Sequence, residues 1–306
     1  MEIKRISIIG MGALGVLYGD FFTQKLGKQH VEFVADEKRI EKYKREGVFC
    51  NGVQCDFNVV NEEEMGKPAD LLVFAVKSTA LDSAIKTARN KVSKDTIILS
   101  LLNGISSEEI IGQVYGMDKM LYCVAQGMDA VKIGNELKYT QMGKICIGIM
   151  DEDEDRKKKL QAVVDLFDRT GLPYTLETDI KHRLWSKFMV NVGVNQAVMI
   201  YEGTYATVQR PGEARELMIA AMREVMMLAE KENVKITEKD LDEYVNLIDR
   251  MNPNGMPSMR QDGLARRKSE VELFAGTVLA LAKKHGISTP VNQKIYDTVR
   301  LMESKY

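Results

Sequence analysis

Residues that bind metals or form disulfides are scarce in this chain. Among its 306 residues there are four cysteines and three histidines. Cys50 and Cys55 have four residues between them and no histidine nearby, and neither Cys123 nor Cys146 has a neighbour at metal-ligand spacing. We therefore expect no bound metal, and we expect a reduced, cytoplasmic protein.

Long hydrophobic runs and an excess of one charge are also missing. No apolar stretch reaches the roughly 18 residues that cross a bilayer. The 43 Lys and Arg residues nearly balance the 44 Asp and Glu residues, which gives no electrostatic basis for binding nucleic acid or a membrane surface. The opening MEIKRISIIGMGALG is basic and then apolar, as in a signal peptide. Its apolar part is short, β-branched and followed by glycines, so it indicates a buried strand instead.

The first half of the chain alternates strand and helix patterns. Helical spacing at residues 12–27 and 79–92 separates apolar runs that predict strands at 5–10, 30–36, 69–76 and 95–103. Two of these runs, ADLLVFAV and DTIILSLLN, are continuously apolar, as in parallel strands buried on both faces. Repeated β-α-β units predict a Rossmann-type, doubly wound parallel sheet with helices on both faces.

The second half changes to helix. Strand patterns at 136–150 and 172–179 flank a charged helix near 153–170, and from about residue 180 only helical patterns follow, at 180–200, 212–232, 237–251, 258–285 and 289–304. At roughly 150 residues per domain, we expect two domains: residues 1–179, built on the parallel sheet, and residues 180–306, all-helical. Since no flexible linker separates them, a ligand is expected in the cleft between them.

The glycine-rich turn predicts dinucleotide binding. It follows a strand pattern and opens a helix, the context that the motif G-x-G-x-x-G requires. The first glycine allows the tight turn, the second lets a pyrophosphate approach the backbone, and the third lets helix and strand pack closely. The free N–H groups of the helix attract the phosphates. The residues are Gly10, Met11, Gly12, Ala13, Leu14 and Gly15.

Asp36 bears on the choice between NAD and NADP. It ends the second predicted strand, about twenty residues beyond Gly15, where an acid usually accepts hydrogen bonds from the adenosine ribose. A carboxylate would repel a 2′-phosphate, so Asp36 favours NAD. Lys38 and Arg39 lie close enough to reach a phosphate, so NADP stays open.

Two polar residues follow strands at the edge where such sheets bind ligands. Lys77 follows LLVFAV and Asn103 follows IILSLL. Lys77 would meet a cofactor phosphate or hydroxyl, and Asn103 would orient nicotinamide or substrate. The alternatives are a solvated loop lysine and a simple Asn-Gly turn.

A polar stripe interrupts the apolar segment WSKFMVNVGVNQAVMI, residues 185–200. Lys187, Asn191 and Asn195 recur every four residues and so share one face of a helix. Asparagine is a poor helix former, and buried amides or amines need partners. The stripe either bonds a neighbouring helix or faces a ligand, for which a lysine could supply a proton.

At this point the chain resembles the ketopantoate reductase (2-dehydropantoate 2-reductase) family over its whole length. The matching pieces, in order, are GMGALG, FAVKS, LLNG, LWSKFMVNVGVNQ and PSMRQDGLARRKSE. The resemblance implies that Lys187 is the general acid and that Glu270 lies near it and the cofactor. It implies that substrate is bound by Asn103, Asn191, Asn195 and Ser258, and that Asn103, Lys77 and Ala130 contact cofactor.

Ser258 and Glu270 also have local explanations. Ser258 with Gln261 forms the capping-box pattern S-x-x-Q at the start of the predicted helix. Glu270 could pair with Arg266 or Arg267 at helical spacing. Two positions depart from the family: Asp36 stands where many members have arginine, and Tyr205 stands where an asparagine contacts substrate.

These features predict an oxidoreductase that reduces 2-dehydropantoate to pantoate with NADPH or NADH, in pantothenate and coenzyme A biosynthesis. An NAD-dependent D-2-hydroxyacid dehydrogenase of the same fold is the alternative, favoured by Asp36 and Tyr205. A non-catalytic dinucleotide sensor would need neither Lys187 nor Glu270. Methionine-rich runs such as LMIAAMREVMML predict core or a subunit interface, so a homodimer is one assembly open to the chain.

Overall fold

The computed structural model describes residues 2–306, whose contacts divide into two units. The first unit contains the residues up to Leu102 together with Ser106–Ile180. The second, called here the helical unit, contains Lys181–Tyr306 and also Asn103–Ile105. The short segment Asn103–Ile105 thus follows a strand of the first unit but packs with the helices of the second.

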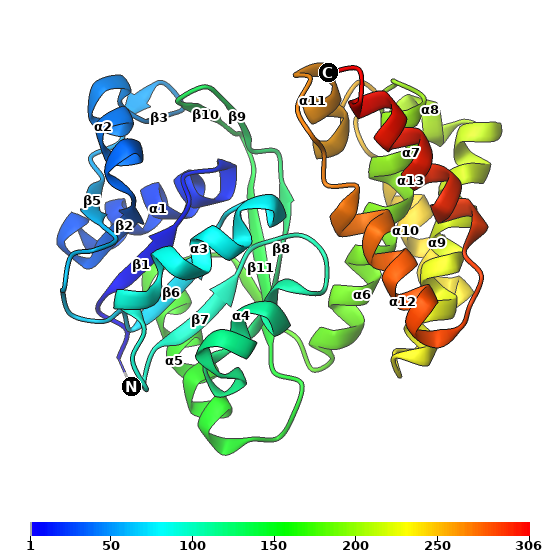
Figure 1. The fold of residues 1–306 in the computed structure, drawn as a ribbon. Helices are drawn as coiled ribbons and strands as arrows, with labels where there is room; N and C mark the ends of the chain where they lie inside the picture. The colour runs from blue at the N-terminus through cyan, green and yellow to red at the C-terminus, as the bar shows by residue number, and fades with distance from the viewer. Residues whose placement is uncertain (1) are drawn as a thin grey trace. The chain divides into compact units, whose positions relative to one another are not determined.

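A five-stranded parallel sheet forms the centre of the first unit (Figure 1), which confirms the predicted fold class. The strands are ordered β5-β2-β1-β6-β7, and every neighbouring pair is parallel. Their bounds are Ile6–Ile9 (β1), Val31–Ala35 (β2), Asn58–Asn61 (β5), Leu71–Phe74 (β6) and Ile97–Ser100 (β7).

Burial on both faces explains the apolar runs of β1, β6 and β7. Ile8 lies in one core with α1 (Ala13–Leu26) and α5 (Glu154–Thr170). Its neighbour Ile9 lies in a separate core with α3 (Leu81–Thr87) and α4 (Ser107–Tyr115). Successive side chains of a strand point to opposite faces, so the helices must cover both sides. The predicted helix 79–92 is α3 flanked by 3₁₀ turns at Ser78–Ala80 and Arg89–Lys91.

The strand predicted at 136–150 is wrong as a single element. It is β10 (Glu136–Lys138) followed by β11 (Met142–Gly148). Asp129 creates the break, because its Oδ1 accepts the N–H groups of Thr140 and Gln141, each at 2.8 Å. β10 joins a small sheet with β3 (Phe49–Cys50), β4 (Val53–Gln54) and β9 (Val131–Ile133), while β11 pairs antiparallel with β8 (Tyr122–Met128) and parallel with β12 (Tyr174–Leu176).

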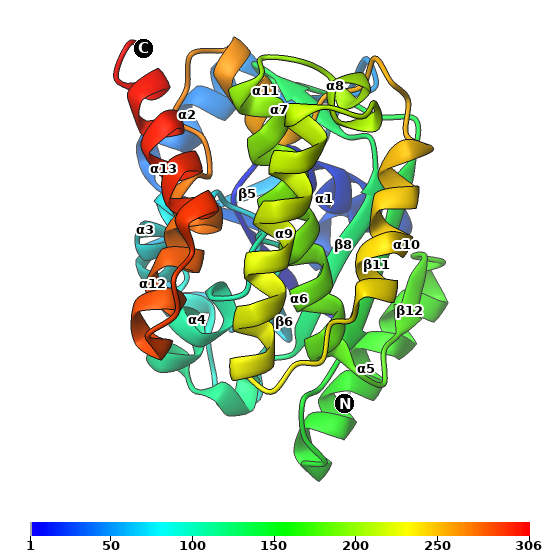
Figure 2. The same ribbon diagram turned by 90° about the vertical axis from the view of Figure 1, so that its right-hand side faces the viewer.

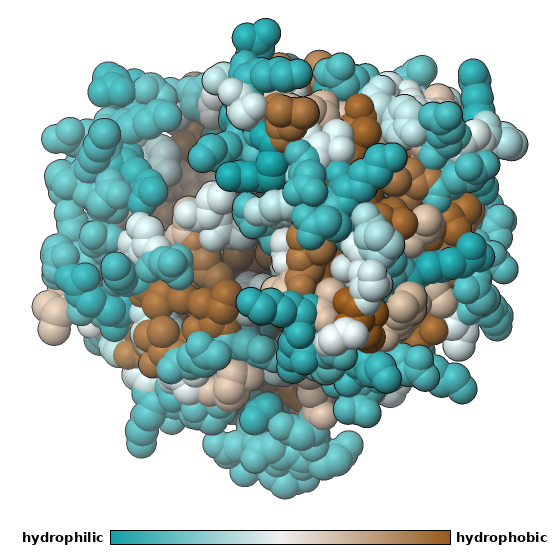
Figure 3. Space-filling view, turned by 45° about the vertical axis from the view of Figure 1, so that its right-hand side comes forward, coloured by the Kyte–Doolittle hydropathy of each residue, from teal (hydrophilic) through white to brown (hydrophobic). Residues whose placement is uncertain are grey.

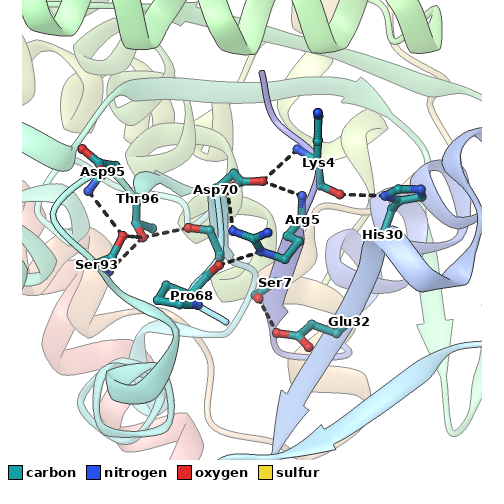
Figure 4. A network of polar contacts seen from close by, with 11 residues as sticks. Lys4, Arg5, Ser7, His30, Glu32, Pro68, Asp70, Ser93, Asp95 and Thr96 are labelled. Carbon is teal, nitrogen blue, oxygen red and sulfur yellow. Dashed lines mark hydrogen bonds and ion pairs between the residues drawn. The ribbon is translucent and has the colours of Figure 1, made fainter. Parts of the chain in front are cut away.

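A polar network fastens the amino ends of the central strands (Figure 4). Asp70 Oδ2 accepts the backbone N–H groups of Lys4 at 2.9 Å and Arg5 at 2.8 Å, and Asp70 Oδ1 pairs with the Arg5 guanidinium at 3.0 Å. Buried Lys91 pairs with Glu32 at 3.0 Å. These contacts lie at the amino ends of the strands. Ligands in such folds bind at the opposite edge, outside the carboxyl ends.

The helical unit packs around α9, which Figure 2 shows between α10 on one side and α12 and α13 on the other. Met218 and Met222 of α9 are fully buried in its core, whereas Met227 is 47% exposed. The helices are α6 (Ile180–Val190), α7 (Gln196–Ile200), α8 (Tyr205–Gln209), α9 (Glu213–Lys231), α10 (Glu238–Asp249), α11 (Ser258–Leu264), α12 (Thr277–His285) and α13 (Pro290–Glu303). Two π-helical turns, η5 (Asn191–Asn195) and η6 (Glu272–Gly276), precede α7 and α12.

The single helix predicted at 258–285 is also wrong. α11 ends at Leu264, and Arg266 takes a left-handed conformation with φ of 48°. Arg267 seals this end, because its N–H donates to Asp262 O at 2.9 Å and its guanidinium pairs with Asp262 Oδ1 at 2.9 Å. Glu270 therefore lies in the irregular segment between α11 and η6 rather than on a helix face.

Hydrophilic side chains cover most of the surface seen in Figure 3, with apolar residues scattered between them. Within residues 2–306, no helix combines the length and the apolar character needed to cross a membrane.

Candidate active site

The glycine-rich turn of the first unit leaves bare backbone at the start of α1. Gly10 has φ of 104°, and a Cβ there would lie 2.6 Å from Val76 Cγ1. A Cβ on Gly15 would lie 2.0 Å from Gly10 O, so helix and strand approach as closely as glycine permits. Gly12 precedes Ala13, the first residue of α1, and has no side chain to cap the helix. This surface therefore fits the pyrophosphate of a dinucleotide.

Asp36 and Arg39 form a pair at the carboxyl end of β2. Asp36 is the N-cap of α2 (Glu37–Glu46): its Oδ1 accepts the Arg39 N–H at 2.8 Å, and its Oδ2 pairs with the Arg39 guanidinium at 2.9 Å. Both side chains remain partly exposed, at 39% and 49%. A carboxylate and a guanidinium thus meet at the carboxyl end of the second strand, where dinucleotide-binding folds in general distinguish a ribose hydroxyl from a 2′-phosphate.

Two more predicted cofactor contacts lie in the first unit. Lys77 is exposed and precedes the 3₁₀ turn after β6. Ala130 is half-buried between β8 and β9.

In the helical unit, hydrogen bonds join three of the four predicted substrate residues. Asn195 Nδ2 donates to Asn191 Oδ1 at 3.2 Å, and Ser258 Oγ donates to Asn195 Oδ1 at 3.1 Å. The Met259 N–H, in the first turn of α11, points to the same Asn195 oxygen at 3.4 Å. The chain of groups from Asn191 to Ser258 presents amide N–H donors and a hydroxyl oxygen without adding a charge.

The π-turn η5 realigns the polar stripe. Over four residues an α-helix overshoots a full turn by about 40°. A π-turn bonds to the fifth residue and has about 4.4 residues per turn, so four residues fall short by about 30°. Lys187 to Asn191 is mainly α-helical and Asn191 to Asn195 is π-helical, so the two drifts nearly cancel. Ideal helix geometry thus predicts that Lys187 and Asn195 share one face, two turns apart.

The fourth predicted substrate residue pairs with the predicted acidic residue. Asn103 Nδ2 donates to Glu270 Oε2 at 3.2 Å. Glu270 is 8% exposed, so its carboxylate depends on such donors. Next to it, Ser269 donates from both its N–H and its Oγ to Glu303 Oε1, at 2.7 and 2.6 Å.

The local explanation for Ser258 is wrong. The N-cap of α11 is Pro257, and the Ser258 hydroxyl bonds Asn195 rather than capping the helix. Gln261 donates to Met256 O at 3.1 Å instead of forming a capping box. For Glu270, the structure shows Arg267 paired with Asp262 and Glu270 itself outside a helix.

Tyr205 opens α8 beside the loop that leads to Ser258. Its N–H donates to Gly255 O at 3.0 Å, and a Cβ on Gly255 would lie 3.1 Å from the tyrosine ring. Burial raises the pKa of its hydroxyl, so the group stays neutral at physiological pH. An aromatic ring therefore packs where the family resemblance leads us to expect an amide.

Gln196 is a residue that the polar stripe does not reveal. It follows Asn195 directly and is fully buried. The signal in the sequence is a third amide in an otherwise apolar segment. Among residues 2–306, no group of three or more His, Cys, Asp and Glu side chains could hold a metal ion.

Comparison with known protein families shows which family the chain belongs to. The models "Ketopantoate reductase PanE/ApbA" and "Ketopantoate reductase PanE/ApbA C terminal" match residues 6–152 and 179–303. The chain belongs to the ketopantoate reductase family. It is thus an NAD(P)-dependent 2-keto acid reductase, and the resemblance seen in its motifs is confirmed.

Relatives of this ketopantoate reductase family member align over nearly the full length. The 2-dehydropantoate 2-reductase of Aquifex aeolicus is 26% identical, covering 98% of this chain and 97% of its own. A structure of D-mandelate dehydrogenase with NADH and anilino(oxo)acetate is 22% identical, with a TM-score of 0.86 over 98% and 99% of the two chains. A dimeric ketopantoate reductase from Staphylococcus aureus is 20% identical, with a TM-score of 0.80 and the same coverage.

Proposed function

We propose that this enzyme reduces 2-dehydropantoate to pantoate, as a step toward pantothenate and coenzyme A. The observation that carries the proposal is the uncharged chain of Asn191, Asn195 and Ser258 beside the stripe lysine Lys187. Neutral donors suit the carboxylate and hydroxyl of 2-dehydropantoate. The near full-length match to curated 2-dehydropantoate 2-reductases supports the choice of substrate.

The proposed roles follow from the chemistry of each side chain. NAD(P)H, when bound, supplies the hydride for the C2 carbonyl. In the first unit, the Gly10–Gly15 turn would hold the pyrophosphate, and Asp36, Lys77 and Ala130 would contact the rest of the cofactor. In the helical unit, Lys187 would protonate the substrate oxygen as its negative charge develops.

The remaining residues would orient the substrate and the acid. Asn191, Asn195 and Ser258 would hold the keto acid, and Glu270, fixed by Asn103, would orient Lys187. Asp36 would accept hydrogen bonds from the adenosine ribose, and we therefore propose that NADH is used at least as well as NADPH.

A second candidate is an NAD-dependent D-2-hydroxyacid dehydrogenase acting on bulkier or aromatic 2-keto acids. Tyr205 favours it, because an aromatic ring next to the Ser258 loop offers apolar contact in place of an amide. Asp36 favours it as well, through the preference for NAD.

Initial rates of cofactor oxidation at 340 nm separate the candidates. The substrates are 2-dehydropantoate, phenylglyoxylate and 4-methyl-2-oxopentanoate, each with NADH and NADPH. Turnover of 2-dehydropantoate that falls by about 10²- to 10⁴-fold in Lys187→Ala supports the proposal. Preference for phenylglyoxylate with NADH would move the assignment to the second candidate. A wild-type protein that binds the cofactor but reduces none of these 2-keto acids would support a dinucleotide sensor instead.

A further inference from the structure

Both π-turns of the helical unit displace a backbone group from its helical partner. In η6, the Gly276 N–H donates to Val271 O, five residues back, at 3.0 Å. That carbonyl is the one that Ala275 would use in an α-helix. In η5, the Gln196 N–H donates to Gly193 O, three residues back, instead of following the i−4 pattern to Val192 O. A buried backbone group needs a replacement partner.

One side chain supplies both replacements. Gln196 Nε2 donates to Val192 O at 2.7 Å, and Gln196 Oε1 accepts the Ala275 N–H at 3.2 Å. Gln196 is completely buried, so water does not compete with the protein for hydrogen bonds to its amide. It therefore ties the backbone of η5 to the backbone of η6.

The two tied turns carry the predicted site residues. η5 begins at Asn191 and ends at Asn195. The segment with Glu270 leads into η6, and Glu270 O accepts the Phe274 N–H within it at 3.1 Å. η6 also packs on the turn after β7, since a Cβ on Gly104 would lie 2.8 Å from Leu273 Cδ1. A shift of η6 would disturb both partners of the Asn103–Glu270 hydrogen bond.

We propose that Gln196 is a positioning residue, which fixes the distance between the asparagine pair of η5 and the Asn103–Glu270 pair beside η6. It acts on the reaction only through these residues and contacts no substrate. This inference rests on the roles proposed above for Asn191, Asn195 and Glu270. Only a side chain that donates at one end and accepts at the other can join the two turns.

Two substitutions test the amide, and one provides a matched control. Gln196→Leu removes both hydrogen bonds at similar volume. Gln196→Glu restores both only when its carboxyl is protonated, and burial raises the pKa of such a group. Gln209→Leu is the control, because Gln209 Nε2 also bonds two backbone carbonyls of this unit, Ile248 O at 2.8 Å and Met251 O at 2.9 Å.

The kinetic result expected is selective. Gln196→Leu lowers kcat/KM for the 2-keto acid by tenfold or more and leaves the KM for NAD(P)H within twofold. Gln196→Glu recovers activity relative to the wild type as pH falls from 8 to 5. Gln209→Leu lowers the melting temperature but keeps kcat/KM within twofold. Gln196→Leu with kcat/KM within twofold of the wild type would overturn the proposal, and so would equal losses in both leucine variants.

Amide hydrogen exchange tests the connection that Gln196 makes between η5 and η6 without any measurement of turnover. Gln196→Leu should speed exchange in residues 191–196 and 271–276 together, and Gln209→Leu should do neither. Faster exchange in one segment alone would overturn the inference. A wild type that reduces no 2-keto acid would refute the proposed function instead, and the exchange data would still decide whether Gln196 joins the turns.

Discussion

Asn103 Nδ2 donates to Glu270 Oε2 at 3.2 Å, across 167 positions of the chain. The bond joins the turn after the last strand of the parallel sheet to the segment between α11 and η6. Asn103 packs with the helical unit although it follows β7. Glu270 is nearly completely buried, so the Asn103 amide is one of the groups that keep its carboxylate oriented.

Asn103→Ala should lower kcat/KM for the 2-keto acid by about 10- to 100-fold, because a hydrogen bond to a charged group contributes about 1.5–3 kcal/mol. Glu270→Ala, which removes the acceptor, should cost at least as much. The double variant should lose less than the product of the two single losses, since both changes remove one interaction. Steady-state kinetics of the four proteins measure this coupling, and strictly multiplicative losses would show that the pair does not act as a unit.

Asp36→Ala should raise the ratio of kcat/KM with NADPH to kcat/KM with NADH. Removing the carboxylate ends its repulsion of a 2′-phosphate and frees the Arg39 guanidinium to bind that phosphate. The variant should also lose about 1 kcal/mol of stability, because Asp36 is the N-cap of α2.

Asp153→Ala separates these two effects. Asp153 caps α5 in the same way, accepting the Arg156 N–H at 2.8 Å. It should show a similar loss in urea unfolding with no change in the cofactor ratio. An unchanged ratio in Asp36→Ala would mean that cofactor choice is made elsewhere.

The sequence predicts those elements whose pattern follows from burial alone. The strand β6 is continuously apolar, and β1 and β7 are nearly so, because helices cover both faces. Gly10 and Gly15 are required by close backbone contacts. Both features are local and leave a clear mark on the residues.

Features that depend on tertiary partners escape prediction. The break after α11 is held by Arg267 and Asp262, and the turn before β11 by Asp129, so helical or alternating periodicity runs through both. The π-turns also escape prediction. Polar residues spaced four apart lie close to one face in either an α-helix or a π-turn, so the spacing does not tell the two apart. The residue connected with both π-turns is Gln196, a buried amide whose partner Ala275 lies 79 positions away in the sequence.

Glu303→Ala should destabilise the protein by about 1–3 kcal/mol, because it leaves the buried N–H and Oγ of Ser269 without their acceptor. Glu303→Gln keeps an acceptor oxygen and should recover most of the loss. Urea unfolding of both variants gives the two free energies. Equal losses would indicate that the charge of Glu303, rather than its hydrogen bonds to Ser269, stabilises the end of α13.

Glu232 makes the helical unit sensitive to acid. Its Oε1 accepts from Lys284 Nζ and lies next to His285 Nε2, each at 2.6 Å. The hydrogen bond from Lys284, followed by that from His285, holds the pKa of the Glu232 carboxyl below its ordinary value of 4.5. A lowered pKa in the folded state means that the carboxylate stabilises the protein above pH 4.5. This contribution disappears as pH falls through the lowered value.

Glu232→Gln should therefore lower the free energy of unfolding at pH 7 by about 1 kcal/mol or less, as expected for a partly exposed ion pair. The difference from the wild type should shrink below pH 4.5 and vanish in stronger acid, where the wild-type carboxyl is protonated too. Urea unfolding between pH 3 and pH 8 measures the curve. Glu230→Gln, which changes an exposed glutamate in the last turn of α9, the helix that Glu232 caps, should show no such trend. A difference that stays constant across this range would mean that packing of Glu232, rather than its charge, provides the stabilisation.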